Sequence, residues 1–161
     1  MEIYLLRHGA AENVAPGRLD SERALTAEGC VKLERVLERA RAANVRPGVI
    51  LSSPYRRALQ TAEAAAAVLG YAGAVVRTAA LLPESSPEDL WEEIRSRSGE
   101  TSILLAGHEP LMSAAVSFLL SSPTLLVNMR KAAMVRVDCE HFGLEPLGVL
   151  QWMLTPGVAG S

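Results

Sequence analysis

Short apolar runs alternate with longer amphipathic segments along most of the chain. Four runs end directly in polar or turn-forming residues, and they lie at residues 3–6, 49–51, 74–76 and 102–106. Runs of this length and composition predict buried strands of a parallel sheet. Two later runs, residues 133–137 and 149–154, predict a pair of strands joined by a turn near Gly143.

The intervening segments predict helices, because their apolar residues recur every three or four positions. Thr26 is a suitable N-cap for the first helix. Its expected inner face consists of Cys30, Leu33, Val36, Leu37 and Ala40.

Three more helices follow from capping signals and periodicity. Ser53 as N-cap and Pro54 as the first helical residue predict a helix that runs to Leu69. Ser86 and Pro87 form a similar start for a third helix. A fourth is expected over residues 110–120.

Strands and helices alternate until the final two strands, which follow one another. Alternation predicts a parallel sheet with helices on both faces. The final pair predicts an antiparallel edge on that sheet. We therefore expect an α/β protein with three layers, α/β/α, whose mostly parallel sheet carries an antiparallel edge strand. The length of 161 residues suits one domain, expected over residues 1–161.

The composition changes this picture little but argues against several classes of function. Apolar residues make up 49% of the chain and charged residues 21%, as in ordinary globular domains. The net charge of −2 offers no basic excess for nucleic acid or anionic lipid. No apolar run approaches the roughly 20 residues of a membrane span, and the N-terminus lacks the pattern of a signal peptide. We therefore expect a cytoplasmic protein without nucleic-acid or membrane partners.

The two cysteines carry no expected chemistry. In a cytoplasmic protein, Cys30 and Cys139 are expected to stay reduced. Both are expected to pack as small core residues.

Charged side chains follow three of the predicted strands. Arg7, His8 and Gly9 follow the first strand, Arg56 follows the second, and His108 follows the fourth. Because ligands of such sheets bind at the carboxyl ends of the strands, these side chains are expected to share one site. No G-x-G-x-x-G motif follows the first strand, which disfavours a dinucleotide-binding role of the Rossmann type.

The residue types at this edge suit phosphate chemistry. Arginine binds phosphate oxygens in pairs, and the helix beginning near Arg56 adds free backbone N–H groups. A neutral His8 among these charges would be a nucleophile for phosphorus. A second imidazole, that of His108, would donate a hydrogen bond to an oxygen that gains charge.

Three segments resemble the histidine phosphatase superfamily, whose hallmark is an Arg-His-Gly motif. They are LLRHG at residues 5–9, SSPYRRALQTA at residues 52–62 and LAGHEP at residues 105–110. The length and the segment RALTAEG at residues 23–29 most resemble the small phosphohistidine phosphatases of the SixA type. The resemblance implies a phosphoglycerate mutase-like fold and a reaction that needs no metal or other cofactor.

The resemblance also implies roles for individual residues. His8 would accept the phosphoryl group. Arg7, Arg56 and His108 would bind its oxygens, together with Gly9 of the motif. Arg23 matches an arginine that reaches the same site in the small subgroup, although a surface ion pair is about equally expected from its position. Arg57 is interpreted as the solvated neighbour of Arg56.

The general acid is left open at this point. In the mutase-like branch of the superfamily, a glutamate before a helix protonates an alkoxide leaving group, and Glu84 lies in roughly that segment. A histidine leaving group is far less basic than an alkoxide, so it needs less help from an acid. Glu84 is therefore a candidate acid for ester substrates above all.

Three functions remain to be compared. The first is a phosphatase acting on phosphohistidine in a protein, such as a histidine phosphorelay domain. The second is a broad phosphomonoesterase for small phosphate esters. The third is a phosphate-binding module without catalysis, which would have no need of a nucleophilic His8.

Overall fold

A computed structural model describes residues 1–160 of the chain. Its centre is a six-stranded sheet with the order β3-β2-β4-β1-β5-β6. The strands are β1 (Glu2–Arg7), β2 (Val49–Ser52), β3 (Val76–Arg77), β4 (Ser102–Gly107), β5 (Met134–Asp138) and β6 (Val149–Leu154). The first four are parallel, whereas β5 pairs antiparallel with both β1 and β6.

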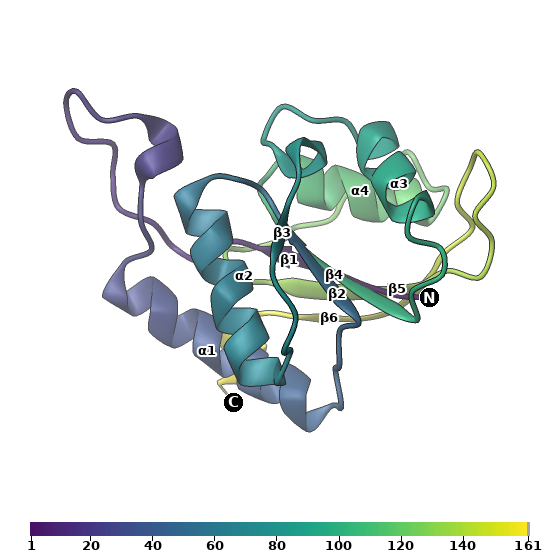
Figure 1. The fold of residues 1–161 in the computed structure, drawn as a ribbon, viewed down its shortest axis with the longest axis horizontal. Helices are drawn as coiled ribbons and strands as arrows, with labels where there is room; N and C mark the ends of the chain where they lie inside the picture. The colour runs from purple at the N-terminus through teal and green to yellow at the C-terminus, as the bar shows by residue number, and fades with distance from the viewer. Residues whose placement is uncertain (161) are drawn as a thin grey trace.

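Helices cover both faces of the sheet and complete three layers (Figure 1). The helices are α1 (Ala27–Ala42), α2 (Arg56–Leu69), α3 (Pro87–Arg95), α4 (Leu111–Leu119) and α5 (Pro156–Ala159). Two short 3-10 turns, η1 (Asp20–Glu22) and η2 (Ala79–Leu81), lie in the connections. This arrangement confirms the predicted α/β/α fold with its antiparallel edge.

Alternate residues of the strands face opposite helical layers. On β1, Ile3 and Leu5 pack toward α3 and α4, whereas Tyr4 and Leu6 pack toward α1 and α2. All four side chains are buried, which explains why the strand is a continuous apolar run. The two cores hold the sheet rigidly between the helices, so the residues at its carboxyl edge are well positioned.

Two details of the helices differ from expectation. Cys30 is exposed, and Gly29 lies on the buried face of α1 in its place. A Cβ at Gly29 would lie 2.3 Å from the carbonyl oxygen of Ala10, so only glycine allows this close approach of α1 to the loop after β1. The expectation that Cys30 is a core residue is therefore wrong.

The second difference concerns the start of α2. The N-cap is Tyr55, and the first helical residue is Arg56 rather than Pro54. Ser53 therefore does not cap the helix, and it is free for another contact described below. Within residues 1–160, no helix is long and apolar enough to cross a membrane.

Candidate active site

The carboxyl ends of three adjacent strands bring the candidate residues together. The backbone N–H of His8, just after β1, donates to the carbonyl of Gly107 on β4 over 3.0 Å. On the other side of β4, the N–H of Ser53 donates to the carbonyl of Ala106 over 3.0 Å. The rings of His8 and His108 are consequently 5.1 Å apart between their centroids.

The contacts of His8 determine which of its nitrogens carries a proton. Its Nδ1 lies 2.7 Å from the carbonyl oxygen of Gly9. A carbonyl only accepts, so Nδ1–H must donate to it. Nε2 then has a free lone pair, which accepts from Nε–H of Arg57 over 3.3 Å. His8 is thus oriented with the lone pair of Nε2 toward the guanidinium of Arg57.

Arg57, and not Arg56, is the arginine beside the two histidines. Arg57 is only 4% exposed, whereas Arg56 is exposed to solvent. The interpretation of Arg57 as a solvated neighbour is therefore wrong. The cause is helical phase: on α2, Arg57 lies on the same buried face as Thr61 and Ala65, which follow at intervals of four residues.

An acidic residue holds Arg57 in place. Arg57 donates from Nη1 to the carbonyl oxygen of Asp20 over 2.8 Å and from Nη2 to its carboxylate over 3.1 Å. Arg23 donates from Nε to the same carboxylate over 2.8 Å. Burial alone would raise the pKa of Asp20, but the hydrogen bonds and charges of both arginines hold it below its ordinary value. Arg23 therefore lies beside the site through an ion pair with Asp20.

The loop carrying His8 is also tied to α2. The N–H of Gly9 donates to the hydroxyl of Thr61 over 3.2 Å, and that hydroxyl donates to the carbonyl of Arg57 over 2.7 Å. Gly9 therefore helps to fix the loop that carries His8 through its backbone N–H.

His108 is oriented by Ser53. Nε2 of His108 lies 2.8 Å from the hydroxyl oxygen of Ser53, which also accepts from the N–H of Tyr55 over 3.3 Å. The hydroxyl of Ser53 contacts no other acceptor within residues 1–160, so its hydrogen points to Nε2 of His108. This assigns the proton of His108 to Nδ1, a buried atom without a hydrogen-bond partner in the described residues. The imidazole can offer this Nδ1–H to an anion.

Arg7 adds a third positive group at the end of β1. Its Nη1 donates to the carbonyl of Met129 over 2.8 Å, and its buried Nε has no partner in the described residues. Burial lowers the pKa of Arg7, an effect that the charge of Glu109 opposes. Arginine nevertheless remains charged at any physiological pH.

Both histidines are neutral at neutral pH. Burial lowers the pKa of His8 to about 4; the charges of Arg57 and Arg7 act in the same direction, and the hydrogen bond to Gly9 opposes them. Burial lowers the pKa of His108 to about 3, and the charge of His8 adds to the effect. A neutral His8 keeps its lone pair available.

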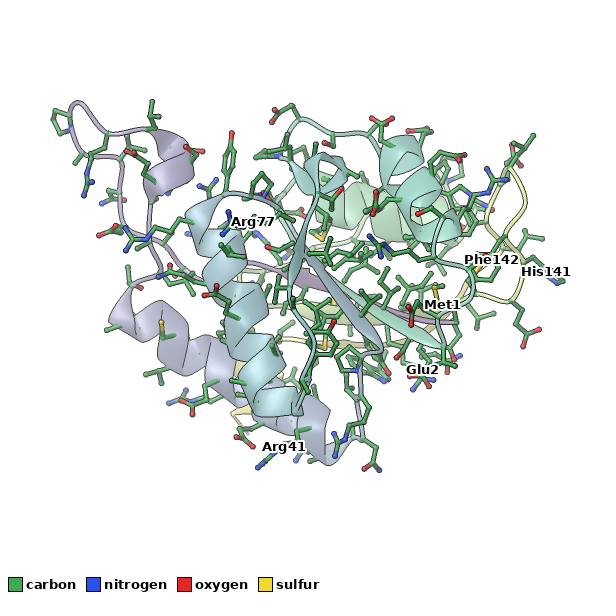
Figure 2. The ribbon with its side chains drawn as sticks, viewed as in Figure 1. Met1, Glu2, Arg41, Arg77, His141 and Phe142 are labelled. Carbon is green, nitrogen blue, oxygen red and sulfur yellow. The ribbon has the colours of Figure 1, made fainter. Side chains whose placement is uncertain are left out.

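Two other candidate residues are exposed to solvent. Glu84 is exposed in the loop before α3 and forms no hydrogen bond or ion pair within residues 1–160. His141 lies near Met1 and Glu2, at the opposite end of β1 from His8 (Figure 2).

The motifs therefore pointed to the correct strand ends but missed three supporting residues: Asp20, Ser53 and Thr61. Thr61 had a usable signal, since it lies four residues after Arg57 on the apolar face of α2. Asp20 had no such signal in the sequence, because only the folded loop brings it close to α2.

The family profile of the histidine phosphatase superfamily (branch 1) matches residues 3–86, which is more than half of the chain. This chain belongs to the histidine phosphatase superfamily. The enzyme is accordingly a phosphatase.

Relatives in both sequence and structure agree with this membership. The phosphatase is 26% identical to the phosphohistidine phosphatase SixA of Escherichia coli over 162 residues, covering 97% of this chain and 94% of the relative. It is 34% identical over 111 residues to an uncharacterized protein of Picosynechococcus, covering 68% of this chain and 67% of the relative. A solved structure of the protein histidine phosphatase SixA with tungstate superposes with a TM-score of 0.83 at 24% identity, covering 98% of each chain.

Proposed function

We propose that this phosphatase removes the phosphoryl group from phosphohistidine in a protein, through a phosphorylated His8. The observation that carries the proposal is the orientation of His8: its Nε2 lone pair faces Arg57 while Nδ1–H is bound to Gly9. The likeness to a named phosphohistidine phosphatase over almost the whole chain supports the substrate class.

In the first step, Nε2 of His8 attacks phosphorus. The bond between phosphorus and the substrate nitrogen breaks as the new bond to Nε2 forms, and the departing imidazole keeps the electron pair and takes a proton from water. Arg57 exchanges its contact with Nε2 for contacts with the phosphoryl oxygens. Arg7 and Nδ1–H of His108 supply further donors for the charge on those oxygens.

In the second step, water attacks the phosphoryl group on His8. The bond between phosphorus and Nε2 breaks, its electron pair returns to the imidazole, and inorganic phosphate leaves with the oxygen of the water. The hydrogen bond from Nδ1–H to Gly9 stabilises the imidazole in its phosphorylated form, which carries positive charge. His8 is thereby regenerated in its starting tautomer.

The leaving group determines how much the reaction depends on Glu84. Glu84 makes no hydrogen bond or ion pair to a site residue within residues 1–160. An alkoxide would require a nearby acid, whereas an imidazole departs with less assistance. A phosphohistidine substrate therefore depends less on Glu84 than an alkyl phosphate ester does.

The experiment compares three substrates: a histidine-phosphorylated protein domain, a phosphoserine peptide and an aryl phosphate. Each is incubated without added metal with wild type, His8→Ala and the control His141→Ala. We expect wild type and the control to hydrolyse the phosphohistidine domain fastest, and His8→Ala to be inactive. Full activity of His8→Ala would overturn the mechanism. Faster turnover of the phosphoserine peptide would overturn the substrate class and make Glu84 the next residue to replace.

A further inference from the structure

A second concentration of positive charge lies beside the site. A cavity of about 780 Å³ is bounded by α1, by residues 128–132 before β5 and by residues 155–157 after β6. Its basic lining residues are Arg7, Lys32, Arg35, Arg130 and Lys131. None of the lining residues that the structure describes is acidic. Both lysines of the whole chain are here, although the chain has a net charge of −2.

Most of this charge is not neutralised within the described part of the chain. Lys32 pairs with Glu28 over 2.8 Å, an exposed pair between successive turns of α1. Arg35, Arg130 and Lys131 are exposed and form no ion pair with any of residues 1–160. Three cations on two different walls thus face the same space, and no carboxylate of residues 1–160 lines it.

The cavity is continuous with the site through Arg7 and the backbone of its own wall. Arg7 lines the cavity and donates to the carbonyl of Met129, which lies between two lining residues. The N–H of Ala132, also in the wall, donates to the carbonyl of His8 over 3.1 Å. A group bound in the cavity therefore lies next to the segment that holds the nucleophile.

We propose that this cavity holds an acidic segment of the phosphoprotein substrate, close to its phosphorylated residue. The inference rests on the proposed function and names the surface that recognises the protein. The cations are solvated and come from separate segments, so each contact with a carboxylate is weak on its own. Several carboxylates displayed together on a protein surface would use them at once, and the cavity is far larger than a single phosphate group.

The test removes two charges from opposite walls in the variant Arg35→Gln/Lys131→Gln. The matched control, Arg39→Gln/Arg46→Gln, removes two exposed arginines that do not line this cavity. With an acidic histidine-phosphorylated domain at low ionic strength, we expect the cavity variant to raise KM roughly 3- to 10-fold at constant kcat. The increase should shrink in high salt, because exposed charges are screened. Turnover of a small aryl phosphate should stay at the wild-type level.

The outcomes separate this inference from the proposed function. An unchanged KM, or an equal increase in the control, would overturn the docking surface while leaving the chemistry at His8 intact. If wild type fails to hydrolyse the domain, the proposed function fails, and titration calorimetry with the unphosphorylated domain still tests docking. Weaker binding by the cavity variant alone would support the surface. Tight binding of free pyrophosphate, lost in the cavity variant without effect on the domain, would assign the cavity to a small anion and overturn the proposal.

Discussion

At the scale of single residues, Arg57 joins His8 to the loop that carries Asp20. Its guanidinium contacts Nε2 of His8 and both the carbonyl and the carboxylate of Asp20. It also lies over the ring of Tyr55, with its central carbon 5.1 Å from the ring centroid. A side chain held from so many directions is preorganised, and preorganised donors are the kind that stabilise charge developing in a transition state.

Separate replacement of Arg57 and of Arg56 by glutamine measures how much each arginine contributes to catalysis. We expect Arg57→Gln to reduce kcat/KM by roughly 10²- to 10³-fold, the usual cost of losing one donor to the transition state. The matched variant Arg56→Gln should retain activity within about twofold, since Arg56 is exposed. Steady-state kinetics with a phosphohistidine substrate gives both values. A larger loss for Arg56→Gln would show that the phosphate approaches along the outer face of α2.

At the scale of elements, the junction between β2 and α2 determines the roles of two residues. The helix begins at Arg56, so the hydroxyl of Ser53 is not used as its cap and contacts His108 instead. Arg57, the second residue of this helix, contacts His8.

Ser53→Ala tests whether this junction determines the tautomer of His108. Without the hydroxyl hydrogen, the proton is no longer directed to Nδ1, and we expect kcat to fall about tenfold because a donor to the phosphoryl group is partly lost. Nitrogen-15 NMR of the histidines should detect protonated Nδ1 of His108 in wild type and a mixture in the variant. Ser52→Ala is the control, because it removes an equally buried hydroxyl that contacts only the carbonyl of Ser53. A wild-type His108 protonated on Nε2 would contradict the assignment.

At the scale of the whole molecule, the fold keeps two imidazoles uncharged inside a positively charged site. His8 is 7% exposed and His108 is 1% exposed. Their pKa values fall to about 4 and about 3 because burial disfavours the charged form. In the unfolded chain both would titrate near the ordinary value of about 6.5.

This difference predicts that stability depends on pH. Between about pH 6.5 and pH 4 the unfolded chain binds protons that the folded chain does not, so the free energy of unfolding falls as pH falls. The titration of His8 alone should lower the free energy of unfolding by on the order of 3 kcal/mol between pH 7 and pH 4. Urea unfolding at pH 7, 6 and 5 measures the slope of the free energy of unfolding against pH. This slope should be smaller in His8→Gln. Equal slopes in the two proteins would show that His8 titrates normally in the folded state.

Much of the fold and the centre of the site followed from the sequence alone. Apolar runs and helical periodicity are local patterns, and burial of those residues requires the three layers that the structure has. Because parallel strands end at one edge, the residues following β1 and β4 had to meet, and His8 and His108 do. The sequence thereby determined the fold class, the edge at which the site lies and the two histidines.

Only the tertiary structure decided which polar groups meet at that edge. Arg56 and Arg57 point about 100° apart on α2, and the packing of this helix turns Arg57 toward His8 and leaves Arg56 exposed. The burial of Thr61 and Ala65 on one face of α2 carried the correct phase, and Arg57 shares it. Asp20 and the basic wall of residues 128–132 left no such local pattern. They reach the site through loops, whose paths depend on contacts between distant parts of the chain.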